Sequence, residues 1–349
     1  MERITMEHGA GGSIMQDLIK RYILGYLGGS NVEVPLEALD DSSVVDGIVL
    51  HTDSHTVKPL FFPGGDIGSL AVAGTVNDVA VLGAEPLALS SGFVLEEGFS
   101  IVELERILGS MSKTCVEAGV YVITGDTKVV ERGALEKFIV NTSCVGRRSE
   151  AVERNLDEVK RYRNFDARWL LDSNLKEGDK IIASGTVGDH GIALLSFREG
   201  YGFESEVVSD IAPLNKMIQH LLREVGGIVA MKDPTRGGLA NTLNEWSEKS
   251  KLGILVYEEK IPVRTGVRAA CEMLGIDPLE VGNEGKVVIA TVPQKAEEVL
   301  EGLRKTKEGK DAQIIGEATK EFGGVVLETG VGGRRILPPP AGDPIPRIC

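Results

Sequence analysis

The stretch Ser69-Leu-Ala-Val-Ala-Gly-Thr-Val-Asn-Asp-Val-Ala-Val-Leu-Gly-Ala-Glu-Pro86 decides the fold of the first half of the chain. Residues 69–82 are nearly all apolar or small, and Gly83 followed by Glu85-Pro86 is typical of a helix end. We therefore predict a helix over 69–82. Because its side chains are small, this helix should pack closely against its neighbours.

Strand and helix patterns alternate on both sides of this helix. A capping box from Ser100 to Glu103 opens an amphipathic helix that Gly119 ends. Residues 120–124 predict a short buried strand that runs directly into the turn Gly125-Asp-Thr-Lys128. The other predicted elements are a hairpin over 44–50, strands at 138–145, 181–184, 228–231, 254–257 and 287–292, and helices beginning near 13, 192 and 239, at 267–274 and at 294–303. This alternation predicts an α/β or α+β protein.

Length and charge pattern predict two domains. Residues 150–168 are highly charged with poor apolar periodicity, which is typical of a domain connection. The predicted division is an N-terminal arm and helix with a glycine-rich flap (1–40), a first domain (41–150), the connection (151–170), a second domain (171–333) and a flexible tail (334–349).

Composition narrows the function classes. The chain has 38 basic and 52 acidic residues and a net charge of -14, which argues against non-specific binding to nucleic acid or to an anionic membrane. No signal core or membrane-spanning run is evident. The four cysteines show no CxxC spacing, so a reducing cytoplasm fits best, and Cys115, Cys144 and Cys271 are predicted to be small core residues.

Four acidic positions lie at predicted strand ends and turns: Asp41 (beside Asp40), Asp53, Asp78 and Asp126. Carboxylates that converge from separate segments would hold a hard cation such as Mg²⁺, which bridges substrate phosphates. For any single aspartate, capping a helix or a turn is the commoner role, and only the set as a whole favours a cation site. Lys128 would neutralise a phosphate, or it is a solvated surface lysine.

Three loops of the second half carry further candidates. In Asp233-Pro-Thr-Arg236, the aspartate would hold a metal and the arginine a phosphate, or the two would pair locally. Glu284, in Gly282-Asn-Glu-Gly285, is a candidate general base or a plain turn residue. The glycine loop 185–191 would suit an anion at a helix N-terminus, and its His190 is interpreted as structural.

The segment 338–349 contains five prolines and ends in Cys349. Proline fixes φ and removes a backbone donor, so the segment should be an extended, semi-rigid arm that carries a thiol at its tip. The alternative is a disordered tail whose final residue happens to be cysteine.

Together these motifs resemble known families. The order Asp40-Asp41, Thr52-Asp53, Val76-Asn-Asp78, Gly83-Ala-Glu-Pro86 and Gly125-Asp126-Thr resembles the ATP-using superfamily of aminoimidazole ribonucleotide synthetase, thiamine-monophosphate kinase and selenophosphate synthetase. The segments 185–191, 232–238 and 282–285, with the ending Pro346-Arg-Ile-Cys349, look like the HypE family of hydrogenase maturation proteins.

The resemblance implies a two-domain PurM-like fold, with an N-terminal ATP-binding domain that forms a homodimer through its sheet and a C-terminal α/β domain. It implies Mg²⁺ and phosphate handling by Asp41, Asp53, Asp78 and Asp126, and a lysine needed for activity at Lys128. The implied nucleotide-binding set is His8, Gly9, Gly11, Gly12, Asp78, Asp126, Thr127, Lys128, Asp233 and Arg236.

The resemblance also implies a reaction at Cys349. In that family the terminal cysteine receives a carbamoyl group from the carbamoyltransferase HypF, and ATP dehydrates the thiocarbamate to a thiocyanate. The cyanide then passes to iron on the HypC and HypD complex during assembly of [NiFe]-hydrogenase. The implied catalytic residues are Cys349, Lys128 and, as base, Glu284.

Two other readings stay open. A kinase or synthetase of the same superfamily would not need the terminal thiol, and the selenophosphate synthetases resemble a pattern with a reactive cysteine near the N-terminus, whereas the first cysteine here is Cys115. A non-catalytic maturation scaffold would present the tail without turning over ATP.

Overall fold

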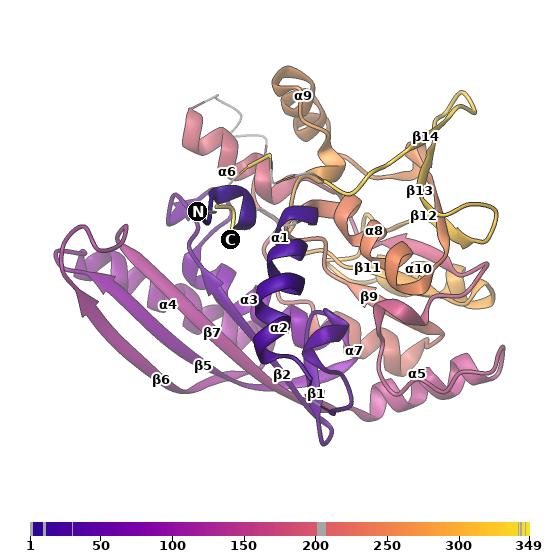
Figure 1. Cartoon of the computed structure of the whole chain (residues 1–349), viewed down its shortest axis with the longest axis horizontal. Coiled ribbons are helices and arrows are strands. Elements are labelled where there is room, and N and C mark those ends of the chain that lie inside the picture. The colour runs from indigo at the N-terminus through magenta and orange to yellow at the C-terminus, as the bar shows by residue number, and fades with distance from the viewer. Residues whose placement is uncertain are drawn as a thin grey trace.

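The computed structural model describes residues 3–9, 12–29, 31–200, 207–340, 342, 344–345 and 347–349, and Figure 1 shows two α/β units side by side. The first unit holds a five-stranded sheet in the order β1-β2-β7-β5-β6, and the second a seven-stranded sheet in the order β14-β13-β10-β12-β8-β11-β9. The mixed α/β architecture that the sequence predicts is confirmed. One hydrophobic core cluster runs through both units.

The strands of the first sheet are β1 (Ser43–Val45), β2 (Ile48–His55), β5 (Ala84–Glu96), β6 (Tyr121–Val130) and β7 (Phe138–Arg148). Those of the second are β8 (Lys180–Ala183), β9 (Ile228–Lys232), β10 (Gly253–Tyr257), β11 (Val288–Thr291), β12 (Gln313–Thr319), β13 (Gly324–Glu328) and β14 (Arg334–Ile336). The α-helices are α1 (Gly12–Leu18), α2 (Leu24–Leu27), α3 (Ile67–Val81), α4 (Ile101–Ala118), α5 (Glu150–Lys160), α6 (Asp189–Glu199), α7 (Asn215–Glu224), α8 (Gly238–Ser250), α9 (Thr265–Leu274) and α10 (Ala296–Arg304). None of these described helices has the length and apolar content needed to span a bilayer.

Helix α3 is the predicted small-residue helix, and almost all of it is buried. It begins two residues earlier than predicted because Asp66 forms the capping box: its carboxylate accepts from the backbone of Gly68 and Ser69, and its own N–H donates to Ser69 Oγ. At Gly68 the absence of a side chain matters, since a Cβ there would overlap the carbonyl oxygen of Ile107 in α4. Small residues therefore allow α3 and α4 to pack backbone against backbone.

Strand β2 places polar groups against α3. Side chains alternate between the two faces of a strand, so His51, Asp53 and His55 share one face. That is the face of Val49, which is fully buried, whereas Leu50 on the other face is half exposed. The strand thus presents three polar side chains to the helix that carries Asp78.

The strand predicted over 120–124 is confirmed from residue 121, but its predicted burial and the turn predicted over 125–128 are wrong. Both segments belong to β6, which pairs in parallel with β5, placing Asp126 opposite Gly92, and lies at the edge of the sheet. Nearly all of its side chains are exposed. The apolar run Tyr121-Val-Ile123 predicts a core strand, because an apolar strand in a globular domain is normally covered on at least one face.

Residues 150–168 are also more structured than the charge pattern indicated. The first part forms α5, which buries Ala151, Val152, Asn155, Leu156 and Val159, a set with helical spacing, and packs against α7. Charged residues fill the positions between them, so the helical periodicity of the buried side chains is hard to recognise in the sequence.

We predict that Gly68→Ala lowers the free energy of unfolding by about 1–3 kcal/mol, because the added methyl group forces α3 away from α4. Urea denaturation followed by circular dichroism measures the change. The matched control is Gly109→Ala in α4, where a Cβ meets nothing within 4 Å and should stabilise the helix by about 0.5–1 kcal/mol. Equal effects of the two substitutions would contradict the close packing argued for Gly68.

Candidate functional site

A cavity of about 480 Å³ lies between the two units, a size common for small-molecule sites. We call it the central cavity. Its polar lining comes from the segment before β1, from β2, α3, β9 and α8, from the loops 233–236 and 282–285, and from the tail. It includes Asp41, His51, Asp53, His55, Asp78, Lys232, Asp233, Arg236, Glu284 and Cys349. Seven residues from six predicted motifs therefore meet in one place: Asp41, Asp53, Asp78, Asp233, Arg236, Glu284 and Cys349.

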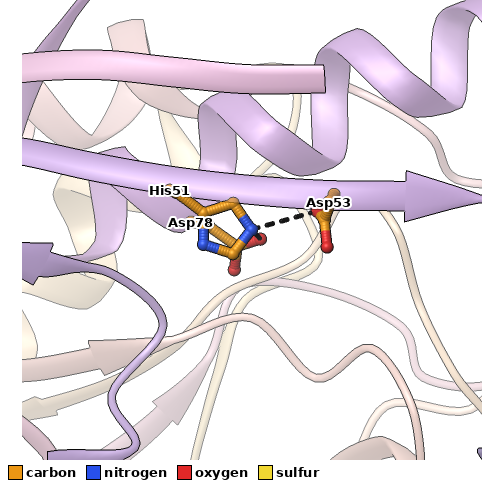
Figure 2. A group of neighbouring side chains, drawn as sticks. All are labelled: His51, Asp53 and Asp78. Carbon is orange, nitrogen blue, oxygen red and sulfur yellow. Dashed lines mark ion pairs between the residues drawn. The ribbon is translucent and has the colours of Figure 1, made fainter. Parts of the chain in front are cut away.

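His51 lies between two of the aspartates, as Figure 2 shows. Its Nε2 is 2.9 Å from Asp78 Oδ2 and 3.2 Å from Asp53 Oδ2, and its Nδ1 contacts the Asp41 carbonyl oxygen. Burial opposes a charge on His51, but Asp78 and Asp53 outweigh it and raise its pKa to about 12. Burial likewise opposes the charge on Asp53, and His51 outweighs it and lowers the pKa of that carboxyl. His51 is thus a fixed cation among the carboxylates.

A second acidic group comprises Asp41, Asp78 and Asp233, whose ligand atoms all lie within 4.8 Å of one another. Burial and the negative charges of Asp78 and Asp41 raise the pKa of Asp233 well above its usual value. Three carboxylates this close repel one another unless a cation lies among them. An all-oxygen donor set of this kind fits a hard cation such as Mg²⁺.

Lys232 joins the two units through buried charge. The residue is the last of β9, and its side chain is 8% exposed. Its Nζ contacts Asp41 of the first unit and lies 3.2 Å from Glu245 and 3.4 Å from Asp172. Burial disfavours its charge, but the three carboxylates outweigh burial and raise its pKa. Lys249 extends the network, 2.6 Å from Asp172 and 3.3 Å from Asp40.

The described part of the tail is folded back onto the body. The carbonyl oxygen of Cys349 accepts a hydrogen bond from the Thr56 N–H at 3.2 Å, and that of Arg347 accepts one from the Lys58 N–H at 3.2 Å. The buried His190 binds the Ile348 carbonyl oxygen through Nε2 at 2.8 Å and Ser209 Oγ through Nδ1 at 2.8 Å. His190 is therefore structural, as predicted, and it holds the tail that brings Cys349 into the cavity.

The same contacts fix the side chains of the tail. Ile345 packs against Gly191 and Ile348 against Gly282, and both isoleucines are fully buried. A Cβ on Gly282 would collide with Ile348, and a Cβ on Gly191 would crowd Ile345 and collide with Val281. The arm expected to be semi-rigid is thus seated in a groove whose shape depends on two glycines.

The interpretation of the glycine loop 185–191 as an anion site is wrong. The amides of Val187 and Gly188 already donate to the Pro262 carbonyl oxygen and to Asn283 Oδ1. The buried carboxylate of Asp189 lies in the first turn of α6. Acceptors from the protein itself thus take the place that an anion would occupy. Two of them, at residues 262 and 283, are too distant in sequence for these hydrogen bonds to be predicted.

Several predicted residues do not line the central cavity of the single chain. Asp126, Thr127 and Lys128 lie on the exposed strand β6, where Lys128 Nζ is 3.7 Å from Asp126 Oδ2 and both side chains are about 70% exposed. His8 accepts a hydrogen bond from the Thr5 N–H. Of the expected flap, Gly12 lines the cavity, His8 and Gly9 do not, and Gly11 lies outside the described residues.

Several polar residues of the cavity were not predicted from the sequence, among them His51, His55 and Lys232. The alternation His51-Thr-Asp53-Ser-His55 was a usable signal, because it places three polar groups on one face of a strand. Lys232, at the end of the apolar run 228–231, was another, since a lysine continuing a buried strand requires buried partners.

Comparisons with known proteins agree with this architecture. Residues 39–148 match the N-terminal domain, and residues 176–328 the C-terminal domain, of AIR synthase related proteins. The chain is 50% identical to a putative hydrogenase expression/formation protein of Methanocaldococcus jannaschii, over 99% of this chain and 100% of that protein. It is 43% identical to the carbamoyl dehydratase HypE of Azotobacter vinelandii, over 99% and 97% of the two chains. The chain belongs to the HypE family.

Two solved structures of the family resemble this one closely. A HypE in complex with ATP has a TM-score of 0.79 and 41% identity, covering 99% of this chain and 100% of that chain. The HypE of a complex between HypE and HypF has a TM-score of 0.83 and 42% identity, covering 93% and 99%. Membership therefore extends over both units of the protein.

We predict that Lys232→Met lowers the free energy of unfolding by about 3–5 kcal/mol, because it leaves Asp41, Asp172 and Glu245 facing one another without their shared cation. The control is Lys20→Met, which removes the exposed ion pair with Glu248 and should change stability by roughly 0.5 kcal/mol or less. Chemical denaturation of the two variants in parallel measures both effects. A loss no larger for Lys232→Met than for the control would show that this buried network is not stabilising.

Proposed function

We propose that the protein is an ATP-dependent carbamoyl dehydratase that converts a carbamoyl group on Cys349 into a thiocyanate, as a step in making the cyanide ligand of [NiFe]-hydrogenase iron. One observation carries the proposal: Cys349 lines the same cavity as Asp41, Asp53, Asp78 and Glu284. Family membership supports it, because several curated relatives bear the name carbamoyl dehydratase.

The reaction removes one molecule of water from an amide. The amide oxygen is a poor leaving group, so it first attacks the γ-phosphoryl group of ATP, releasing ADP, while the nitrogen loses one proton and the C–N bond becomes C=N. The C–O bond then breaks, the oxygen departs as phosphate, the second N–H proton leaves, and the nitrile forms. The protein must therefore hold the triphosphate, orient the amide and accept protons.

Glu284 is the proposed proton acceptor. Its side chain is 4% exposed, and its Oε1 has no hydrogen-bond partner among the described residues. Burial, then the charges of Asp210, Asp53 and Asp78, raise the pKa of this carboxyl well above its usual value. A raised pKa makes Glu284 a stronger base than an exposed glutamate, and a base works best when its pKa lies near the working pH.

Mg²⁺ would be held by Asp41, Asp53, Asp78 and Asp233, and when bound it offsets negative charge on the transferring phosphoryl group. Arg236, which lines the same cavity, is proposed to contact a phosphate, and the negative charge of Cys349 raises the pKa of its guanidinium group. Gly12, with the flap residues His8, Gly9 and Gly11, is proposed to cover the nucleotide. ATP as the nucleotide is supported by the solved relative that contains it.

The residues on β6 would act from a dimer interface. The first sheet carries α3 and α4 on one face, and its exposed apolar side chains include Leu50 and its register partner Val145, with Tyr121, Ile123 and Val129 on the edge strand. We infer that a second copy of the chain covers these residues. In such a dimer the side chains of Asp126, Thr127 and Lys128 would be buried at the interface, and from there they would contribute to the nucleotide site.

The proposed partners follow from the chemistry of loading and unloading Cys349. A carbamoyltransferase of the HypF type would load the thiol, which the solved HypE and HypF complex supports. A HypC and HypD complex would accept the cyanide on its iron, and both exchanges would take place in the cytoplasm. Each requires the tail to leave the groove, because the hydrogen bonds of Cys349 and Ile348 hold the thiol inside the cavity.

We predict that, after loading with carbamoyl phosphate, ATP and the carbamoyltransferase, mass spectrometry of the C-terminal peptide finds a carbamoyl adduct on Cys349. The adduct should lose the mass of one water only when hydrolysable ATP is present. Asp78→Asn should retain the adduct and slow the water loss at least 100-fold, because it removes a carboxylate shared by both acidic groups. Water loss at the wild-type rate in Asp78→Asn would favour a phosphoryl-transfer site elsewhere, and no ATP-dependent loss in the wild type would favour the scaffold reading.

We also predict that Ile123→Glu converts a dimer into a monomer and abolishes ATP-dependent water loss, because it places a charge in the proposed interface, on the strand that carries Lys128. Light scattering after size-exclusion chromatography measures the mass. The matched control is Met273→Glu on α9, also an exposed apolar residue and 73% accessible, which should leave mass and activity unchanged. A wild-type monomer with full activity would overturn the interface.

A further inference from the structure

His55 has a buried ring that no step described so far uses. The residue is 3% exposed, follows Asp53 on the same face of β2 and lines the central cavity. Its Nδ1 is buried and has no hydrogen-bond partner among the described residues. A buried polar atom without a partner is costly, so its persistence in an active site calls for a ligand that satisfies it.

A hydroxyl chain determines which ring nitrogen of His55 carries hydrogen. The hydroxyl of Thr142 donates its single hydrogen to the Ala71 carbonyl oxygen at 3.1 Å, and it lies 2.6 Å from the Thr75 hydroxyl. Towards His55 Nε2, 3.4 Å away, Thr142 Oγ1 can therefore only accept. Nε2 then carries the hydrogen, which the Asp53 carboxylate 4.0 Å away also favours. Nδ1 is left as a bare acceptor.

Gly74 has no side chain to fill the space beside the His55 ring. A Cβ on Gly74 would lie 3.5 Å from His55 Cε1, 3.7 Å from Glu284 Oε2 and 3.8 Å from Asp53 Oδ2. We call this space the Gly74 gap. Two of the side chains around it, His55 and Glu284, each have a buried atom without a hydrogen-bond partner among the described residues, and both of those atoms can accept.

Cys349 is held next to this place. The Thr56 N–H that binds the Cys349 carbonyl oxygen belongs to the residue immediately after His55. Cys349, His55, Gly74 and Glu284 all line the same cavity. A small planar group on the thiol would thus lie in the same cavity as both acceptors, His55 Nδ1 and Glu284 Oε1.

We propose that His55 positions the carbamoyl group, with Nδ1 accepting a hydrogen bond from its amide N–H while Glu284 accepts from the other N–H. The inference rests on the proposed function. An amide nitrogen held by two acceptors turns the carbonyl oxygen away from them, towards the part of the cavity that would hold the nucleotide. His55 takes no proton in this arrangement. The pair also selects a carbamoyl group over an acetyl group, which has no N–H to donate.

The first test is spectroscopic and does not depend on turnover. Full-length protein labelled with ¹⁵N in its five histidines is treated with potassium cyanate, since cyanic acid adds across a thiol S–H to give the S-carbamoyl group. Cys115, Cys144 and Cys271 are buried, and Cys349→Ala controls for reaction elsewhere. We expect long-range ¹H–¹⁵N spectra to show His55 as the Nε2–H tautomer, and its Nδ1 signal to shift on carbamoylation of Cys349. The signals are assigned by their loss in His55→Gln.

The second test compares variants by the single-turnover rate of water loss from the carbamoylated protein. His55→Gln keeps a donor where Nε2 lies but has no acceptor where Nδ1 lies, so its rate should fall about 100-fold, the cost of misorienting a reacting group. His55→Asn offers an oxygen near the position of Nδ1 and should recover part of the rate. Thr142→Val should slow water loss and broaden or move the His55 signals, and Thr142→Ser should restore both. Affinity for ATP with Mg²⁺ should stay unchanged in all four variants.

The outcomes separate this inference from the proposed function. An Nδ1–H tautomer, or an Nδ1 signal that carbamoylation leaves unmoved, overturns the role of His55 whether or not the protein dehydrates its adduct. A wild-type rate in His55→Gln does the same, and so does a loss of ATP affinity that accounts for the slower rate. If the wild type shows no ATP-dependent water loss but Nδ1 responds to carbamoylation, the proposed dehydration fails and the carbamoyl-binding role of His55 stands.

Discussion

The structure depends on a lysine buried among carboxylates at the junction of its two units. Lys232 ends a strand of the second sheet and contacts Asp41 of the first unit, and it shares Asp172 with Lys249. Without these cations the aspartates could not be both buried and charged, because each carboxylate raises the pKa of the next. Burial and the charges of Asp172 and Asp78 raise the pKa of Asp41 to about 7, although the positive charge of Lys232 acts to lower it. The network therefore holds the two units in register and sets the charge of the cavity between them.

The tail turns a reaction between two molecules into one within a single chain. The thiol of Cys349 reaches the cavity through a segment whose prolines restrict its freedom before it docks, so less entropy is lost when it becomes ordered. Docking relies on backbone hydrogen bonds and two buried isoleucines, which a partner protein can compete for once it offers the tail other contacts. A groove that bound the tail much more tightly would protect the reacting group but would hinder its transfer to and from partners.

Local patterns predicted the elements, and chemistry predicted part of the site. The helix ends at Gly83 and Gly119 and the Ser100 cap could be read from the sequence because they depend on a few adjacent residues. Convergence of Asp41, Asp53 and Asp78 could only be hypothesised, since it depends on the packing of β2 against α3. The exposure of β6 could not be foreseen at all, because an apolar strand at a sheet edge has the same pattern as a buried one. His51 and His55 were not predicted, although their alternation with Asp53 places all three side chains on one face of β2.

The charge of the central cavity also bears on how a nucleotide would enter it. The lining includes nine aspartates and glutamates and four lysines and arginines, so a free triphosphate would meet net repulsion. His51 offsets part of this charge, but it is fixed between Asp53 and Asp78 and has no freedom to follow a phosphate. A divalent cation among Asp41, Asp78 and Asp233 would reverse the local sign and lower the raised pKa of Asp233, since a nearby positive charge favours the ionised carboxylate. The same carboxylates that would repel ATP alone would therefore bind the cation of a metal–ATP complex and so favour its entry.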